Sequence, residues 1–122
     1  MRSPADIDKI QSFMAALGRT VKGAGRDYPT EGATALLYGW RSSTIDVDLK
    51  ADPEPAGFFE AIAAIKDSLD VNIELAAQDQ CIPELPGWRD RSSFIAKHGL
   101  QDFFHYDIYS QALAKIERGH DQ

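Results

Sequence analysis

Residues 32–49 read GATALLYGWRSSTIDVDL. After Gly32, the apolar run from Ala33 to Trp40 predicts a short helix. Arg41 to Thr44 is polar and predicts a turn. From Ile45 to Leu49, apolar and acidic residues alternate with the two-residue period of a strand that has one buried face. The segment therefore predicts a helix, a turn and a strand in immediate succession.

Two acidic residues, Asp46 and Asp48, lie two positions apart in this predicted strand. Their side chains should share one face and lie about 6–7 Å apart. At that spacing both can ligate one small hard cation such as Mg²⁺, which binds carboxylate oxygens at about 2.0–2.1 Å. The same pattern is also typical of a half-exposed edge strand with a polar outer face. The acidic pair alone leaves both interpretations open.

The composition is that of an ordinary globular protein: 122 residues, 43% hydrophobic and 26% charged, which fits one domain over residues 1–122. No apolar run approaches the roughly 20 residues that span a bilayer, and the N-terminus lacks a signal-peptide pattern. The single cysteine, Cys81, excludes an internal disulfide and suits a reducing cytoplasm. The net charge of −6 argues against a broad nucleic-acid-binding surface, because such surfaces cluster Lys and Arg.

The region before this segment predicts one helix and little else. Ser3 as a cap and Pro4 at the first helical position indicate a helix that runs to about Leu17. Lys22 to Glu31 contains two glycines and a proline and is the least regular part of the chain. Because Pro29 cannot donate a ladder hydrogen bond, we expect any strand here to be short or at a sheet edge.

After the acidic strand, the pattern predicts a helix and a second strand. The helix follows a turn at Asp52 to Pro55, and the strand spans Val71 to Leu75. The predicted buried stripe of the helix consists of Phe58, Ile62, Ile65 and Leu69. A strand–helix–strand unit permits a right-handed crossover, which can bring Glu74 beside Asp46 and Asp48.

The last part of the chain predicts a loop, a hairpin and a helix. Ile82 to Trp88 should be a loop anchored by Trp88, and Ser93 to Ala96 should pair with Phe103 to His105. A final helix is expected from Tyr106 to Arg118. Together these elements predict an α+β fold of two layers, with a small mixed sheet of about three to five strands packed against three or four helices.

The chain resembles a known family over nearly its whole length. The run Gly-Trp-Arg-Ser-Ser-Thr-Ile-Asp-Val-Asp-Leu from Gly39 to Leu49, which follows a glycine and a short helix, resembles the nucleotidyltransferase superfamily with the DNA-polymerase-β-like fold. His105-Tyr106-Asp107, which leads into Ala-Leu-Ala-Lys-Ile-Glu-Arg-Gly at residues 112–119, looks like one small bacterial branch of it. Small bacterial members include minimal nucleotidyltransferases and the transferases of toxin–antitoxin pairs.

The resemblance implies a magnesium-dependent transfer of a nucleoside monophosphate from a nucleoside triphosphate. Asp46 and Asp48 would then ligate Mg²⁺, and Glu74 would be the third acid. Negative charge on the triphosphate must be neutralised during such a transfer, which is the role of the cations. The implied nucleotide-binding residues are Gly32 at the phosphate turn, Arg41 and Ser43 in the polar turn, and Lys115 and Arg118 on the last helix.

Three functional hypotheses follow. The first is an active, cytoplasmic nucleotidyltransferase that acts on a protein hydroxyl or an RNA end, with a toxin–antitoxin system as one setting. The second is an inactive member that binds a protein partner or a second copy of itself, because Glu31 stands where the family carries glycine and because the chain stops at Gln122, short of its relatives. The third is a metal-dependent phosphohydrolase, which can also carry Asp-x-Asp. The histidines, at 98, 105 and 120, show no zinc-ligand spacing with cysteine.

Overall fold

A computed structural model describes residues 4–75 and 85–112 of the chain, which fold into one sheet and the helices that pack on it. The elements in chain order are α1 (Ile7–Thr20), β1 (Gly25–Thr30), α2 (Glu31–Leu37), β2 (Asp46–Ala51), α3 (Phe58–Leu69), β3 (Asn72–Leu75), α4 (Trp88–Arg91), β4 (Ser93–His98) and β5 (Gln101–His105). Residues 108–112 are also helical.

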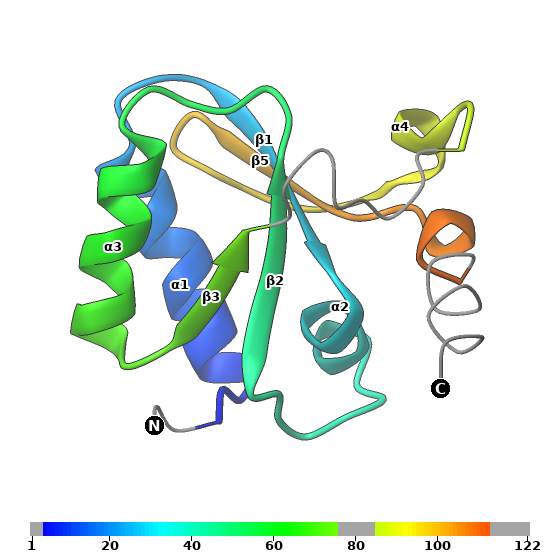
Figure 1. Cartoon of the computed structure of the whole chain (residues 1–122), viewed down its shortest axis with the longest axis horizontal. Helices are drawn as coiled ribbons and strands as arrows, with labels where there is room; N and C mark the ends of the chain where they lie inside the picture. Colours follow the sequence, from blue (N-terminus) through cyan, green and yellow to red (C-terminus); the bar gives the residue numbers. More distant parts are fainter. Residues whose placement is uncertain (1–3, 76–84, 113–122) are drawn as a thin grey trace.

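The five strands form one mixed sheet in the order β3-β2-β1-β5-β4 (Figure 1). The pairs β2–β3 and β1–β5 are parallel, whereas β1–β2 and β4–β5 are antiparallel. The predicted α+β class with a small mixed sheet is therefore confirmed. The parallel pairing of β2 and β3 confirms that the helix α3 connects two neighbouring strands, as the strand–helix–strand pattern predicted.

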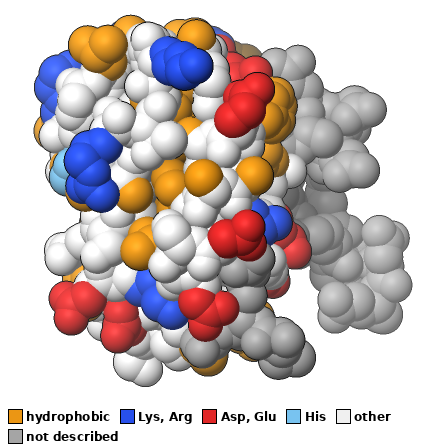
Figure 2. Space-filling view, turned by 90° about the vertical axis from the view of Figure 1, so that its left-hand side faces the viewer, with side chains coloured by type: hydrophobic (Ala, Val, Ile, Leu, Met, Phe, Trp, Pro, Cys, Tyr) orange, Lys and Arg blue, Asp and Glu red, His pale blue; other side chains and the backbone are white. Residues whose placement is uncertain are grey.

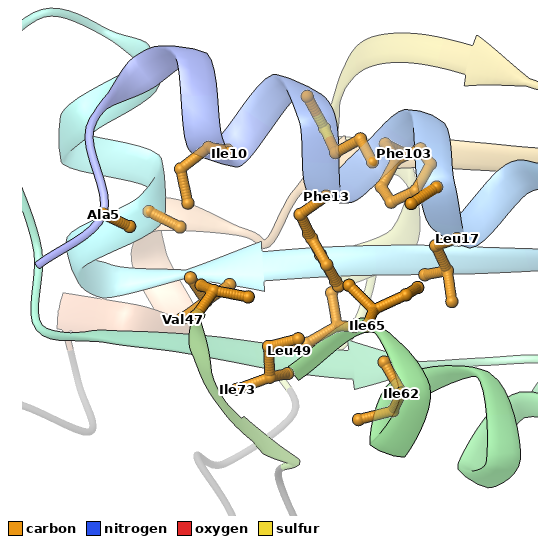
Figure 3. Packing of buried hydrophobic residues seen from close by; sticks show 14 of the residues in the cluster. Ala5, Ile10, Phe13, Leu17, Val47, Leu49, Ile62, Ile65, Ile73 and Phe103 are labelled. Carbon is orange, nitrogen blue, oxygen red and sulfur yellow. The ribbon is translucent and has the colours of Figure 1, made fainter. Parts of the chain in front are cut away.

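The main hydrophobic core lies between the sheet and the helices α1 and α3, which run side by side on one face (Figure 1). In Figure 3, Phe13 of α1 points toward Ile65 of α3 above the strand β2. Val47 and Leu49 of β2 are 1% and 0% exposed on this inner face. At about 25 cal/mol per Å² of apolar surface removed from water, such burial is the largest stabilising term in the fold.

A smaller aromatic cluster covers part of the opposite, outer face of the sheet. Tyr28, Trp88 and Tyr106 are buried there, and Phe104 packs against them. The rings of Tyr28 and Trp88 meet edge to face, with their centroids 4.9 Å apart. Trp88 is therefore the anchor that the sequence predicted for its loop, although residues 82–84 of that loop lie outside the described part of the chain.

The first helix begins and ends later than predicted. Asp6, not Ser3, is the residue at its N-cap, where its carboxylate accepts a hydrogen bond of 2.9 Å from the backbone N–H of Lys9. The helix also continues through Gly18 to Thr20. Gly18 serves close packing and does not end the helix, since a Cβ at this position would lie 2.4 Å from the carbonyl oxygen of His98 on β4.

The expectation for Lys22 to Glu31 was wrong, because β1 is the central strand of the sheet. Pro29 pairs with Leu49 on β2, and its carbonyl accepts hydrogen bonds from the N–H of Tyr106 and the hydroxyl of Thr34. The registered ladder to β5 ends at Asp27, two residues earlier. The backbone nitrogen of Pro29 therefore faces β5 beyond the end of that ladder. Because no ladder hydrogen bond is needed there, its lack of a hydrogen costs none.

The helix α2 ends at Leu37, three residues before the predicted end at Trp40. The N–H of Gly39 bonds to the carbonyl of Leu36, and the N–H of Trp40 bonds to that of Ala35. Gly39 has a φ of +81°, so these bonds form a C-terminal capping motif in which glycine takes the left-handed position. The helix stops because this motif satisfies its last carbonyl groups.

The strand β2 is shifted by one or two residues from its predicted bounds. It runs from Asp46 to Ala51, and Ile45, which was expected to share the buried face, is 61% exposed. The preceding Thr44 instead pairs with Ala5 in an isolated bridge. The sheet is therefore entered at Asp46, and Ile45 lies outside the packed face.

The remaining predictions hold with small shifts in bounds: β3 begins one residue after the predicted Val71, and the last helix begins at residue 108, two after the predicted Tyr106. The short helix α4 was not predicted. Three of the four residues in the predicted stripe of α3, Phe58, Ile62 and Ile65, are buried, and β4 and β5 form the expected hairpin around Gly99. The final helix is described only over residues 108–112.

None of the described helices combines the length and apolar character needed to cross a membrane. On the face seen in Figure 2, charged side chains of both signs are dispersed among hydrophobic ones.

Candidate functional site

The candidate site begins with the two acidic residues of β2. Val47 and Leu49 point to the inner core, so Asp46 and Asp48, which alternate with them, lie on the outer face. Both aspartates are half-buried. Their shared face agrees with the prediction from the alternating sequence.

The neighbouring strand β3 adds a third carboxylate to this face. The register pairs Asp48 with Glu74 and Asp46 with Asn72. Side chains of laterally paired residues lie on the same face of a sheet, and neighbouring strands are about 4.7–4.9 Å apart. The side-chain amide of Asn72 donates a hydrogen bond to Asp46. The expectation that the crossover brings Glu74 beside this acidic pair is therefore met at Asp48.

These acids do not build a metal cage by themselves. Among residues 4–75 and 85–112, no group of three or more His, Cys, Asp or Glu side chains has an arrangement that could hold a metal ion. Mg²⁺ nevertheless is commonly held by only one or two protein carboxylates together with phosphate oxygens and water. The hard oxygen ligands of Asp46 and Asp48 fit that second type of site, in which a nucleotide supplies the remaining ligands.

Gly32, the predicted phosphate-turn residue, lies next to this acidic face. It is buried one residue inside α2, and a Cβ there would lie 2.3 Å from the hydroxyl oxygen of Thr44 and 3.5 Å from a terminal guanidinium nitrogen of Arg41. The hydroxyl of Thr44 donates to the carbonyl of Asp46 over 3.0 Å. The close approach to Thr44 explains why glycine is required here, and it links the start of α2 to the acidic strand.

A cavity of about 360 Å³ opens beside Gly32. Its described lining comes from α2, the following turn and the last helix: Gly32, Thr34, Ala35, Trp40, Arg41, Ile108, Gln111 and Ala112. The structure thus brings together two of the predicted nucleotide-binding residues, Gly32 and Arg41. Ser43 is exposed in the turn and does not line this cavity. Lys115 and Arg118 lie outside the described residues.

An aromatic row that sequence reasoning missed adjoins this cavity. The ring of Tyr38 stacks on His105, with centroids 4.2 Å apart at 18°, and on Trp40, with centroids 4.8 Å apart at 20°. Burial lowers the pKa of His105, which favours its neutral imidazole. The Tyr-Gly-Trp sequence at residues 38–40 was the available signal, since a glycine between two aromatics can turn both rings to one side.

A second cavity of about 360 Å³ lies on the other side of Ile108 and contains an ion pair. The guanidinium of Arg91 makes a bidentate contact with Asp107, at 2.6 and 3.1 Å. Burial acts to raise the pKa of the Asp107 carboxyl, but hydrogen bonds from Arg91, Ser110 and the N–H of Tyr109 outweigh it and lower that pKa. This ion pair fixes the start of the last helix. The guanidinium of Arg91 donates its hydrogen bonds to Asp107 and to the carbonyl of Pro86.

No family model matches the sequence, and no curated protein or solved structure gave a match in the comparisons. The relation to nucleotidyltransferases therefore rests on the residues themselves and stays a prediction.

Proposed function

We propose that this protein is a magnesium-dependent nucleotidyltransferase. It would transfer a nucleoside monophosphate from a nucleoside triphosphate to a hydroxyl group of a protein or of an RNA end. One observation carries the proposal: Asp46 and Asp48 share the outer face of β2, and Glu74 lies opposite Asp48 on β3. The cavity with Gly32 and Arg41 in its lining supports it by providing room for a nucleotide, and none of the three acids is among its described lining residues.

The charge requirements of phosphoryl transfer explain the choice of residues. When bound, Mg²⁺ would neutralise negative charge on the phosphates. Asp46 and Asp48 would hold it together with phosphate oxygens, and Glu74 would hold or orient a water molecule at the same place. Arg41 brings a fixed positive charge with a planar fork of donors, which suits bidentate contact with a phosphate.

The proposed reaction is a single displacement at the α-phosphorus of the nucleotide. The acceptor hydroxyl oxygen forms a bond to that phosphorus, while the bond from phosphorus to the bridging oxygen of the leaving group breaks. Pyrophosphate leaves with the bonding electron pair, and the hydroxyl proton is released to water. The protein contributes positioning and charge stabilisation, which are the main sources of rate enhancement in this chemistry.

The proposed partners follow from the same chemistry. They are a nucleoside triphosphate, an acceptor that carries a hydroxyl group, and a protein partner or second copy if the chain acts in a toxin–antitoxin pair. The net charge of −6 favours a protein acceptor or a short RNA end over an extended nucleic acid. The cytoplasm, which holds nucleoside triphosphates and keeps thiols reduced, is the compartment that this proposal requires.

The test is transfer of label from each nucleoside triphosphate in the presence of Mg²⁺, with the protein itself, a protein mixture and short RNA as acceptors. We expect Asp46→Asn and Asp48→Asn to lower the rate by about 100-fold or more, since each removes a charge that binds the cation. Glu60→Gln is the matched control, because Glu60 is an exposed acid on α3 in the helical layer. Equal label in wild type and Asp48→Asn would refute the proposal.

A second candidate function is an inactive interaction module that binds a protein partner. The observation that favours it is a group of exposed hydrophobic side chains at the cavities, namely Tyr38, Trp40, Ile108 and Tyr109, each between 41% and 67% exposed. Apolar groups exposed together often mark an interface. This function predicts no label transfer with any nucleotide and no binding of Mg²⁺ with ATP, so the transfer assay separates it from the first.

A further inference from the structure

The aromatic row of His105, Tyr38 and Trp40 leads from the interior to the surface. His105 is 8% exposed, Tyr38 is 41% exposed and Trp40 is 67% exposed. The near-parallel rings form two successive stacked contacts, and the row ends on the indole of Trp40. The row therefore presents a large aromatic ring at the surface, supported by the rings stacked behind it.

The backbone holds Trp40 in this place. Gly39, with its φ of +81°, ends α2, and the N–H of Trp40 bonds to the carbonyl of Ala35 over 2.8 Å. Tyr38 supports the indole from below, and the buried His105 supports Tyr38. His105 also lies 3.4 Å from the hydroxyl oxygen of Thr34, measured from its Nδ1. The row is therefore organised before any ligand binds, which lowers the entropic cost of stacking.

The described lining of the cavity beside Trp40 combines apolar side chains with one cation. Arg41 is the one charged side chain among its described lining residues. A ligand that fits must therefore offer a flat aromatic face to Trp40 and a negative group to Arg41. Every nucleobase has such a face, and stacking on a protein aromatic tolerates any base. The volume of about 360 Å³ lies within the range of small-molecule sites.

We propose that Trp40 is the base-stacking platform for a nucleoside phosphate, with the base inside this cavity and a phosphate on the guanidinium of Arg41. The phosphates would then run past Gly32 toward Asp46, because a Cβ at Gly32 would lie 3.5 Å from Arg41 and 2.3 Å from Thr44, whose hydroxyl bonds to the carbonyl of Asp46. The assignment deepens the proposed transferase function and rests on it for the direction of the phosphates. The stacking itself can be tested without any transfer reaction.

The test uses tryptophan fluorescence of the full chain. The chain has two tryptophans, and only Trp40 is exposed, since Trp88 is 4% exposed in the aromatic cluster. The Trp40 signal is the difference between wild type and Trp40→Phe. We expect AMP to quench this signal without Mg²⁺, whereas ribose 5-phosphate at the same concentration leaves it unchanged. Equal effects of the two ligands would overturn the proposal, because the phosphate alone would then account for binding.

Equilibrium dialysis with labelled ATP provides the second readout. Trp40→Ala should weaken binding by about tenfold, whereas Trp40→Phe, which keeps an aromatic face, should bind nearly as well as wild type. Phe59→Ala is the matched control, because Phe59 is 58% exposed on α3 and lines neither cavity. Unchanged affinity in Trp40→Ala would overturn the assignment of this residue.

The failure of this inference can be distinguished from failure of the proposed function. Asp48→Asn should lose transfer but keep the quenching by AMP. If AMP quenches Trp40 and wild type transfers no label, the platform stands and the transferase proposal fails. If Trp40→Ala transfers label with an unchanged KM for the nucleotide, the transferase proposal stands and the platform is refuted. Absence of both quenching and transfer refutes both.

Discussion

Asp27 on β1 and Asp48 on β2 lie on adjacent strands, yet their side chains lie on opposite faces of the sheet. Asp27 pairs with Ala51, which places it on the inner face with Leu49, whereas Asp48 pairs with Thr30 on the outer face. Asp27 is fully buried, and neither of its carboxylate oxygens has a hydrogen-bond partner among the residues that the structure describes. Asp48 is half-buried and lies next to Glu74.

The contrast shows how the position of a carboxyl group decides its charge state. Burial, with a smaller contribution from the charge of Asp102, raises the pKa of Asp27 from 3.8 to about 7. Asp27 is therefore largely protonated below neutral pH and unsuited to bind a cation. The outer-face acids retain contact with water, so a cation can approach them. Aspartate is thus unfavourable for stability on the inner face and has a proposed binding role on the outer face.

The largest expected effect concerns the pH dependence of stability. Between pH 4 and 7 the folded protein keeps a proton on Asp27 that the unfolded chain releases, so the free energy of unfolding falls as the pH rises through 7. A shift of this size corresponds to about 4 kcal/mol at most. Asp27→Asn, which is neutral at every pH, should flatten the curve of chemical denaturation against pH between 5 and 8. A wild-type curve that rises over this range would contradict the assignment.

A smaller effect, about 1–3 kcal/mol, is expected from crowding the helix layer that covers the inner face. Gly18→Ala places a Cβ 2.4 Å from the carbonyl oxygen of His98, so α1 must move away from the hairpin and the protein should lose stability. Gly23→Ala is the matched control, because its Cβ would meet nothing closer than 3.5 Å. Denaturant titration compares the two variants. Equal stability of both would show that α1 does not pack closely on β4.

The smallest effect on stability is expected on the outer face. Glu74 is exposed, so Glu74→Gln should change the free energy of unfolding by no more than about 0.5 kcal/mol. The same substitution should weaken binding of Mg²⁺ together with ATP, measured by calorimetry. An acid on the inner face is thus expected to affect stability, whereas an acid on the outer face is expected to affect ligand affinity. A large loss of stability in Glu74→Gln would mean that this acid is a structural residue.

Sequence patterns were sufficient for the elements whose burial has a clear period. The alternation around Val47 and the stripe of α3 each follow from one buried face, and the order of β2, α3 and β3 in the chain permits the crossover that the structure has. β1 was missed because its pattern is not periodic: its inner face carries Gly25, Asp27 and Pro29, none of which is a typical core residue of a strand. Only the positions of the neighbouring strands explain why that segment is central.

The residues of the candidate site also divide into those that the sequence predicted and those that it did not. The acids of β2 and β3 were predicted because the strand period is a local property and because the strand–helix–strand order permits β2 and β3 to be neighbours. The aromatic row was not, since His105 comes from β5 and meets Tyr38 only in the folded chain. The end of α2 was placed three residues too late because Tyr38 and Trp40 are apolar enough to extend a helical pattern. The capping bonds around Gly39 are what stop it.

The central claim is that the outer-face acids bind Mg²⁺ together with a nucleoside triphosphate. The most direct measurement is the melting temperature of wild type and Asp48→Asn as Mg²⁺ and each nucleoside triphosphate are titrated. Ligand that binds only the folded state stabilises it, by about 2.7 kcal/mol at a concentration 100 times the Kd. We predict that Mg²⁺ increases the rise caused by nucleotide in wild type and adds nothing to it in Asp48→Asn. An identical effect of Mg²⁺ on the two proteins, or no effect of Mg²⁺ in wild type, would contradict the claim.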